Sequence, residues 1–413
     1  MFGSLSERAS VERVENVVLF VSDAMRYDFL PQSVRRLGVT AKGIAPSTFT
    51  ASSLPSLTSG QYPATHRVWM FDDQLAETPP LLDGSATDVG FDAEAVWPEL
   101  PAPEKPPLQI HHLTEERTLD DLEPPFTHVV HDVGPHAPYG FDNGVFESTK
   151  AFFEEHERRR APLVSLYRED CRRSASRFLD IYDDLEERGL LSETLVIFTS
   201  DHGQCLGEPA NGGRFGHGHP MVPETVEIPV VFAGAGLPRG REYGALVSGT
   251  DIAPTAHSAQ RGRVSDLVDG LDLWTETPPE DRTPRSDVWQ HLDVGVGPLD
   301  YELTVYAATS AWSEDGGHIF QRGSSAERTV ALGYDNCFRG YSPAWRHNSS
   351  PGSLLSFLAL SLQRELTFGA PDFTREAARE EVPSAFQTGD PAVTDTTLSD
   401  RQEDRLRDLG YLK

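Results

Sequence analysis

The chain of 413 residues has little lysine and little cysteine, and it has no long hydrophobic run. Four lysines stand beside 32 arginines, and 64 acidic residues bring the formal net charge to −28. Such a surface is typical of proteins that work in high salt. Dense carboxylates repel one another at low ionic strength and are screened within about 3 Å at molar salt. We therefore predict a salt-loving source organism.

The same scarcities exclude several classes of protein. Nucleic acid is not expected as a partner, because phosphate backbones need clustered basic residues and these arginines are scattered among acids. The three cysteines, Cys171, Cys205 and Cys337, are too few and too widely spaced for a disulfide framework or a CxxC metal site. The sequence shows no apolar signal segment and no apolar run of about 18 residues. We expect a cytoplasmic protein without a membrane span, and no pattern indicates its oligomeric state.

Three apolar runs end in polar, titratable residues. Residues 194–199, 16–22 and 127–131 lack polar alternation, which predicts strands buried on both faces of a mostly parallel sheet. The groups that follow these runs are Asp23, Asp132, His136, Asp201 and His202. In open α/β sheets the carboxyl ends of such strands meet at one edge, where ligands bind. A site at this edge is therefore expected.

A hydroxyl-rich segment from Thr50 to Gly60 predicts a short helix that begins in a loop. The start of a helix offers free N–H groups and a positive dipole end, both of which suit an anionic ester. Thr50 or Ser52 alone could be only a helix cap.

The remaining pattern predicts a doubly wound α/β domain over residues 1–275 and a smaller α+β subdomain over residues 276–413. The elements expected are an amphipathic helix at 162–188, a strand at 227–233, short strands at 301–306, 318–322 and 329–332, an acidic tail at 371–399 and a short terminal helix at 406–413. A glycine-rich loop between the helix and the 227–233 strand carries His217 and His219.

Oxygen and imidazole groups together suit one divalent metal ion (Ca, Mn, Mg or Zn). We predict that Asp23, Thr50, Asp201 and His202 bind it. Thr50 would be the nucleophile, because the metal lowers the pKa of a bound hydroxyl. His136 or His217 would orient the ester or protonate the leaving group; these two and Thr50 are the predicted catalytic residues.

Six segments, in this order along the chain, resemble motifs of the sulfatase branch of the alkaline phosphatase superfamily. They are residues 17–28, 60–66, 135–139, 198–203, 216–218 and 409–412. The resemblance implies a sulfatase-like enzyme from a halophilic archaeon that hydrolyses or transfers sulfate or phosphate esters of small molecules, glycans or lipid headgroups. It also implies substrate contacts from Arg26, Ser53 and His219.

The chain departs from sulfatases at the nucleophile, where they carry Cys or Ser in C/S-x-P-x-R. Counting ten residues back from Gly60, as the family does, selects Thr50, whereas local similarity to x-Pro-Ser selects Ser53. Threonine cannot be converted to formylglycine, and Leu54 stands where the motif has Arg. The resemblance to threonine-using relatives mildly favours phosphate.

Two alternatives accompany this interpretation. In a two-metal phosphodiesterase-type enzyme, Asp132, His136 and His217 would bind a second ion. In the other alternative the chain is a non-catalytic relative that binds anions or glycans.

Overall fold

The computed structural model describes residues 3–93, 96–140, 146, 148–262, 267–296, 299–387 and 398–409, with the side chains of 292–303 left aside. The main sheet has the strand order β10-β2-β8-β5-β1-β4-β3, and β9 pairs with β2. Its strands are β1 Asn16–Ser22, β2 Val39–Ile44, β3 Asp88–Asp92, β4 Phe126–Asp132, β5 Thr194–Thr199, β8 Glu227–Gly234, β9 Arg241–Glu242 and β10 Val247–Ser248. The central neighbours β5, β1, β4 and β3 run parallel, while β8 is antiparallel to both of its neighbours.

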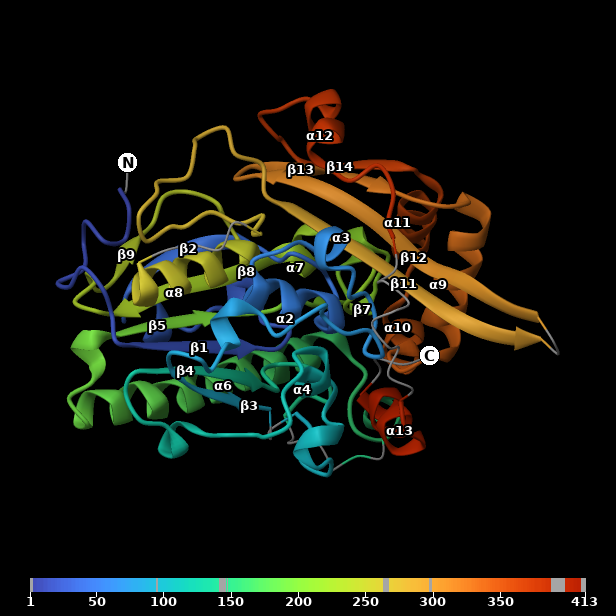
Figure 1. Ribbon diagram of the computed structural model, residues 1–413. Coiled ribbons are helices and arrows are strands. Elements are labelled where there is room, and N and C mark those ends of the chain that lie inside the picture. The colour runs from blue at the N-terminus through green and yellow to red at the C-terminus, as the bar shows by residue number, and fades with distance from the viewer. Residues whose placement is uncertain are drawn as a thin grey trace.

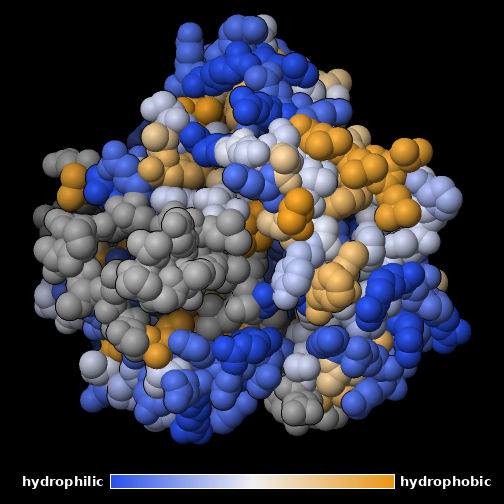
Figure 2. Space-filling view, turned by 90° about the vertical axis from the view of Figure 1, so that its right-hand side faces the viewer, coloured by the Kyte–Doolittle hydropathy of each residue, from blue (hydrophilic) through white to orange (hydrophobic). Residues whose placement is uncertain are grey.

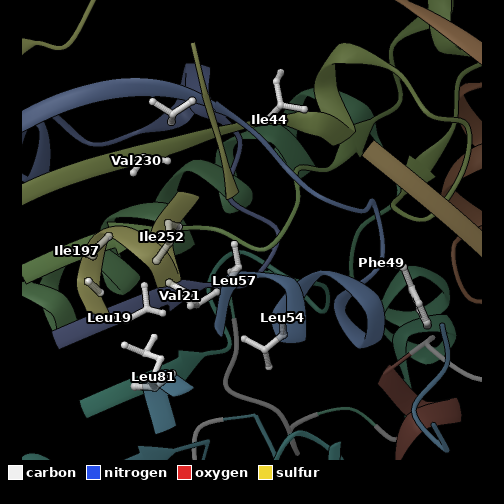
Figure 3. Close-up of a cluster of buried hydrophobic side chains, with 14 of the residues drawn as sticks. Leu19, Val21, Ile44, Phe49, Leu54, Leu57, Leu81, Ile197, Val230 and Ile252 are labelled. Atoms are coloured by element: carbon white, nitrogen blue, oxygen red, sulfur yellow. The ribbon is translucent and has the colours of Figure 1, made fainter. Parts of the chain in front are cut away.

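Helices cover both faces of this sheet (Figure 1). The helices of this part of the chain are α1 Gln32–Arg35, α2 Thr50–Ser59, α3 Pro63–His66, α4 Pro106–Ile110, α5 Thr149–Glu155, α6 Arg160–Glu187, α7 Pro223–Val226 and α8 Ile252–Arg261. α2 and α8 pack on the face that Leu19 and Val21 of β1 present (Figure 3). α6 packs on the opposite face, against Phe20 of β1. Apolar residues therefore fill both faces of β1, as its unbroken apolar run predicts.

The C-terminal part forms a separate antiparallel sheet, in the order β11-β12-β13-β14. Its elements are β11 Arg285–Val296, β12 Leu299–Ser313, β13 Gly316–Gln321, α9 Ser325–Phe338, α10 Ser342–Asn348, α11 Pro351–Leu362, β14 Glu365–Gly369, α12 Arg375–Glu381 and α13 Asp400–Leu409. A two-stranded ribbon, β6 Cys205–Leu206 with β7 Phe215–Gly216, lies between β5 and β8 of the main sheet in sequence. The predicted fold class, a doubly wound, mostly parallel sheet followed by an α+β part, is confirmed. The boundary at residue 275 stays a prediction.

Two local predictions need correction. Residues 329–332 lie in helix α9, not in a strand. Ser324 caps the start of this helix, because its side chain accepts a hydrogen bond from the Glu327 N–H in the first turn. The terminal helix begins earlier than predicted, at Asp400, and the residues after 409 lie outside the described part. Among the described helices, none combines the length and apolar character needed to cross a membrane.

Candidate metal centre and active site

Three adjacent parallel strands bring acidic and imidazole groups to one edge of the sheet. Asp23 follows β1, His131 and Asp132 end β4, and Asp201 and His202 follow β5 after one residue. β1 lies between β4 and β5 with its residues in parallel register to both. All five side chains are buried. The predicted convergence of the strand ends is therefore confirmed.

A cluster fit to hold a cation is formed by Asp23, His131 and Asp201. One ligand atom from each lies within 4.8 Å of those of the other two. Asp201 Oδ1 accepts hydrogen bonds from Ala24 N (3.1 Å) and His202 N (2.9 Å), while its Oδ2 is buried and accepts none from a described residue. Two carboxylates and an imidazole are a donor set that manganese and zinc share. The residues therefore fit one divalent ion.

The electrostatics of this cluster also favour a cation. Burial raises the pKa of Asp201, and the neighbouring charge of Asp23 raises it further. Burial would also raise the pKa of Asp23, but His136, His131 and His202 outweigh it and hold that pKa well below its usual range. Burial opposes the charged form of His131, yet its contact with Asp23 raises the pKa of the imidazole. A bound metal ion would neutralise the negative charge of these carboxylates in place of the proton on His131.

The alternation of side chains along β4 separates His131 from Asp132. His131 lies opposite Val21, on the α2 face, whereas Asp132 lies opposite Ser22, on the α6 face. There Asp132 accepts hydrogen bonds from Ser174 Oγ (2.6 Å), Gly134 N (2.9 Å) and the Arg177 guanidinium. The structure thus does not bring Asp132 to the cluster. His131, which the strand pattern alone did not select, takes that place.

Thr50 is the first residue of α2, and its side chain lies beside the cluster, in contact with His202. Its Oγ1 lies 3.0 Å from His202 Nε2, and only 1% of the residue is exposed. His202 Nδ1 donates to the Gly203 carbonyl oxygen (2.9 Å), so in the neutral ring Nε2 is the acceptor. The Thr50 hydroxyl therefore donates its hydrogen bond to an imidazole that borders both carboxylates, at 3.8 Å from Asp23 and 3.4 Å from Asp201.

Ser53, the competing hydroxyl, lies one helical turn further along α2. Its Oγ donates to the backbone oxygen of Asp201 (2.5 Å). Ser53 thus holds the Asp201 backbone against the helix, while Thr50 faces the imidazole. Pro55 lies inside the helix, as the count from Gly60 requires, and Gly60 ends α2 with φ +75°, a left-handed conformation that suits glycine.

His136 and His217 form a second imidazole pair beside the cluster. Their Nε2 atoms lie 3.1 Å apart, and the His217 ring stacks on His202 with 4.2 Å between ring centres. His136 Nδ1 is bonded to the Ala137 oxygen (2.7 Å) and His217 Nδ1 to the Thr48 oxygen (3.4 Å). Because a carbonyl oxygen only accepts, Nε2 is the nitrogen without hydrogen in both neutral rings. Burial lowers both pKa values, that of His217 strongly. The structure brings both predicted catalytic histidines to Thr50 and His202.

The other predicted substrate contacts have partners within the protein. Arg26 forms ion pairs with Asp28 (2.8 Å) and Glu208 (2.7 Å), which raise the pKa of its guanidinium against the opposing effect of burial. His219 Nε2 lies 3.2 Å from a guanidinium nitrogen of Arg214. Both side chains therefore hold loops around the site.

Comparison with known proteins identifies relatives of the chain. A sequence model of the sulfatase family matches residues 112–260. The low-salt glycan biosynthesis sulfotransferase Agl7 of Haloferax volcanii is 42% identical over 412 residues, which span 99% of each chain. Arylsulfatase K of Gallus gallus is 29% identical over 136 residues, 32% of this chain and 24% of that protein.

Solved structures show the same fold at low sequence identity. Phosphonate monoester hydrolases from Silicibacter pomeroyi and Agrobacterium radiobacter superpose with TM-scores of 0.54 and 0.51, each at 16% identity. The matches cover 74% and 84% of this chain and 86% and 96% of theirs. With the near full-length similarity to the Haloferax protein and the strand-end cluster in place, the chain belongs to the sulfatase family of the alkaline phosphatase superfamily.

Proposed function

We propose that the protein transfers a sulfuryl group from an organic sulfate ester to a hydroxyl of a glycan, with Thr50 as the nucleophile. The observation that carries the proposal is the 3.0 Å contact between Thr50 Oγ1 and His202 Nε2 beside the buried Asp23, His131 and Asp201. The name of the 42% identical relative, a glycan biosynthesis sulfotransferase, supports sulfate and a glycan acceptor.

Asp23, His131 and Asp201 would hold one divalent ion, with His202 and Thr50 at its side. Such an ion would lower the pKa of a nearby hydroxyl and neutralise the negative charge of the transferred group. The engagement of Asp132 by Arg177 and Ser174 favours one ion over two.

Attack begins with the loss of the Thr50 proton to His202 Nε2, which the Gly203 carbonyl holds in the accepting tautomer. The Thr50 oxygen forms a bond to sulfur as the bond from sulfur to the donor oxygen breaks. His202 then returns the proton to the departing oxygen. Threonine is thereby activated by an adjacent base, as buried hydroxyl nucleophiles require.

The second half of the reaction must use another nucleophile. Thr50 has a single oxygen on Cβ, so a sulfuryl group bound there leaves only when a second oxygen attacks sulfur. His136 and His217, kept neutral by burial, are suited to accept the proton of an acceptor hydroxyl. The proton lost by the acceptor balances the one that Thr50 regains. Because the Thr50 hydroxyl is almost completely buried, a bound glycan would exclude water and favour transfer over hydrolysis.

The test uses p-nitrophenyl sulfate as donor and an oligosaccharide with free hydroxyls as acceptor, in molar KCl with Mn²⁺. Nitrophenol, inorganic sulfate and sulfated oligosaccharide are measured together. We expect nitrophenol release to depend on the acceptor, with little inorganic sulfate. Thr50→Ala should lower turnover by about 10³-fold or more, whereas Ser52→Ala, which removes a buried hydroxyl from the same helix, should stay within about twofold.

Other outcomes would replace the proposal with its alternatives. Inorganic sulfate released without acceptor would identify a hydrolase, and turnover of p-nitrophenyl phosphate in place of the sulfate would make the phosphate ester the substrate. Turnover that survives Thr50→Ala would remove Thr50 as the nucleophile. Glycan binding with no turnover of any ester would leave the non-catalytic binding protein.

A further inference from the structure

An apolar patch stands out on the otherwise acidic surface of the C-terminal part. Among the described residues, eight large apolar side chains are exposed, and seven of them lie on α9 and α11, with exposed fractions between 42% and 72%. We call these seven the α9/α11 patch: Val330, Tyr334, Phe338, Leu354, Leu355, Leu358 and Leu362. The two helices lie at the right of Figure 1, and Figure 2, which faces that side, shows hydrophobic residues gathered in its upper right.

The spacing within the patch makes it continuous along both helices. Val330, Tyr334 and Phe338 follow one another at intervals of four residues, and so do Leu354, Leu358 and Leu362, which places each set on one face of its helix. The two helices are tied together because Arg328 Nε of α9 donates to the Ser361 oxygen of α11 (2.8 Å). Exposed apolar patches of this kind mark sites of interaction.

The segment of the chain that carries the patch has a net charge opposite to that of the whole protein. Helix α11 carries no charged residue, and residues 322–364 contain five arginines and only two acids, in a protein of net charge −28. Arg346 and Arg364 are exposed at the ends of α10 and α11. Of the two acids, Asp335 is already paired with Arg214.

We propose that the α9/α11 patch docks the protein on an anionic lipid bilayer, with the leucines and aromatic rings in the interface and Arg346 and Arg364 at the headgroups. Amphipathic helices with apolar and basic faces bind membranes in this way. A second copy of the chain fits less well. In a two-fold interface the same surface faces itself, so the arginines would oppose arginines with almost no free acid to pair them. The proposal goes beyond the proposed function and does not rest on it.

The docked face is connected to the catalytic loop. Arg214 donates from Nε to the His219 oxygen (2.7 Å) and is bonded to Asp335 and Asn336, on the inner side of α9. The loop that carries His217 is thus held by the helix whose outer side carries Tyr334 and Phe338. Docking would place this loop close to the bilayer surface.

The test is co-sedimentation of the full chain with vesicles of phosphatidylglycerol and phosphatidylcholine, or of phosphatidylcholine alone, in 1 M KCl. Leu355→Asn combined with Leu358→Asn should lower the partition coefficient on anionic vesicles by about tenfold or more, with an unchanged melting temperature. The matched control is Leu267→Asn, which changes an exposed leucine outside the patch and should stay within about twofold.

Variants of the two arginines distinguish a lipid bilayer from other apolar partners. Arg346→Glu with Arg364→Glu should weaken binding to anionic vesicles more than binding to neutral ones. The difference should grow as the KCl concentration is lowered, because molar salt leaves only direct contacts with headgroups unscreened. Absence of binding to anionic vesicles, or equal binding by the leucine variant, would overturn the proposal. So would sedimentation equilibrium showing a dimer that the leucine variant converts to a monomer, because the patch would then be an interface between copies.

Discussion

The contact between Asp132 and Arg177 supports the proposal of one metal ion rather than two, and it can be tested through stability. Asp132 is 2% exposed and accepts from Ser174, from Gly134 N and from two nitrogens of Arg177. Removing one partner of a buried pair costs about 3–5 kcal/mol. The Arg177 side chain is 36% exposed, so water weakens the pair, and we expect about 2 kcal/mol for Arg177→Met.

A double-mutant cycle with Asp132→Asn isolates the pair. Each single variant should lose about 2 kcal/mol of unfolding free energy in urea at fixed molar KCl, and the double variant should lose little more, which gives a coupling of about 2 kcal/mol. Metal analysis of the purified proteins should find one ion per chain in wild type and in all three variants. If Asp132→Asn instead halved the metal content while the energies simply added, Asp132 would be a metal ligand and the two-metal alternative would stand.

Two further predictions concern histidines of β4. His131→Ala should reduce bound metal by about 10-fold or more in affinity, measured by titration with Mn²⁺, while His156→Ala, at an exposed imidazole, should bind as wild type does. His128 is buried, which lowers its pKa from 6.5 to about 4, so its contribution to stability is complete above pH 6.5 and is lost as the pH falls toward 4. Between pH 7 and pH 4, the free energy of unfolding of His128→Leu should therefore fall by about 3 kcal/mol less than that of wild type. An equal fall for the two proteins, measured by urea unfolding at both pH values, would contradict this.

Much of the fold is predictable because the main sheet is buried on both faces. The runs that become β1 and β5 are apolar without alternation, and the acids that follow them stand at the sheet edge. The resemblance to the family placed Thr50 by a count of ten residues back from Gly60, and Gly60 does end α2 in a left-handed conformation. The ends of these strands and the end of α2 are therefore marked by residues close to them in the sequence.

The features that the sequence did not predict depend on contacts between segments far apart in the chain. His131 and Asp132 are adjacent in sequence, and both can bind metal. Only the register of β4 against β1 shows which of them faces α2 and the cluster. The role of Asp132 further depends on Arg177, 45 residues away on α6. Residues 329–332 were misassigned because a short window with Thr329 and Val330 resembles a strand, whereas the helix is set by its cap and by packing on α11.

The acidic composition and the site make opposite demands on an anionic substrate. A net charge of −28 repels a sulfate ester at long range, but at molar salt this repulsion extends only about 3 Å from each charge. Under the proposed function, recognition would then come from groups that touch the ester. These would be a cation held by Asp23, His131 and Asp201 and the imidazoles of His136 and His217. Because these groups are buried, salt screens them far less than it screens the surface. High salt therefore removes the repulsion while leaving the attraction in place, so the acidic surface is compatible with a site for anions.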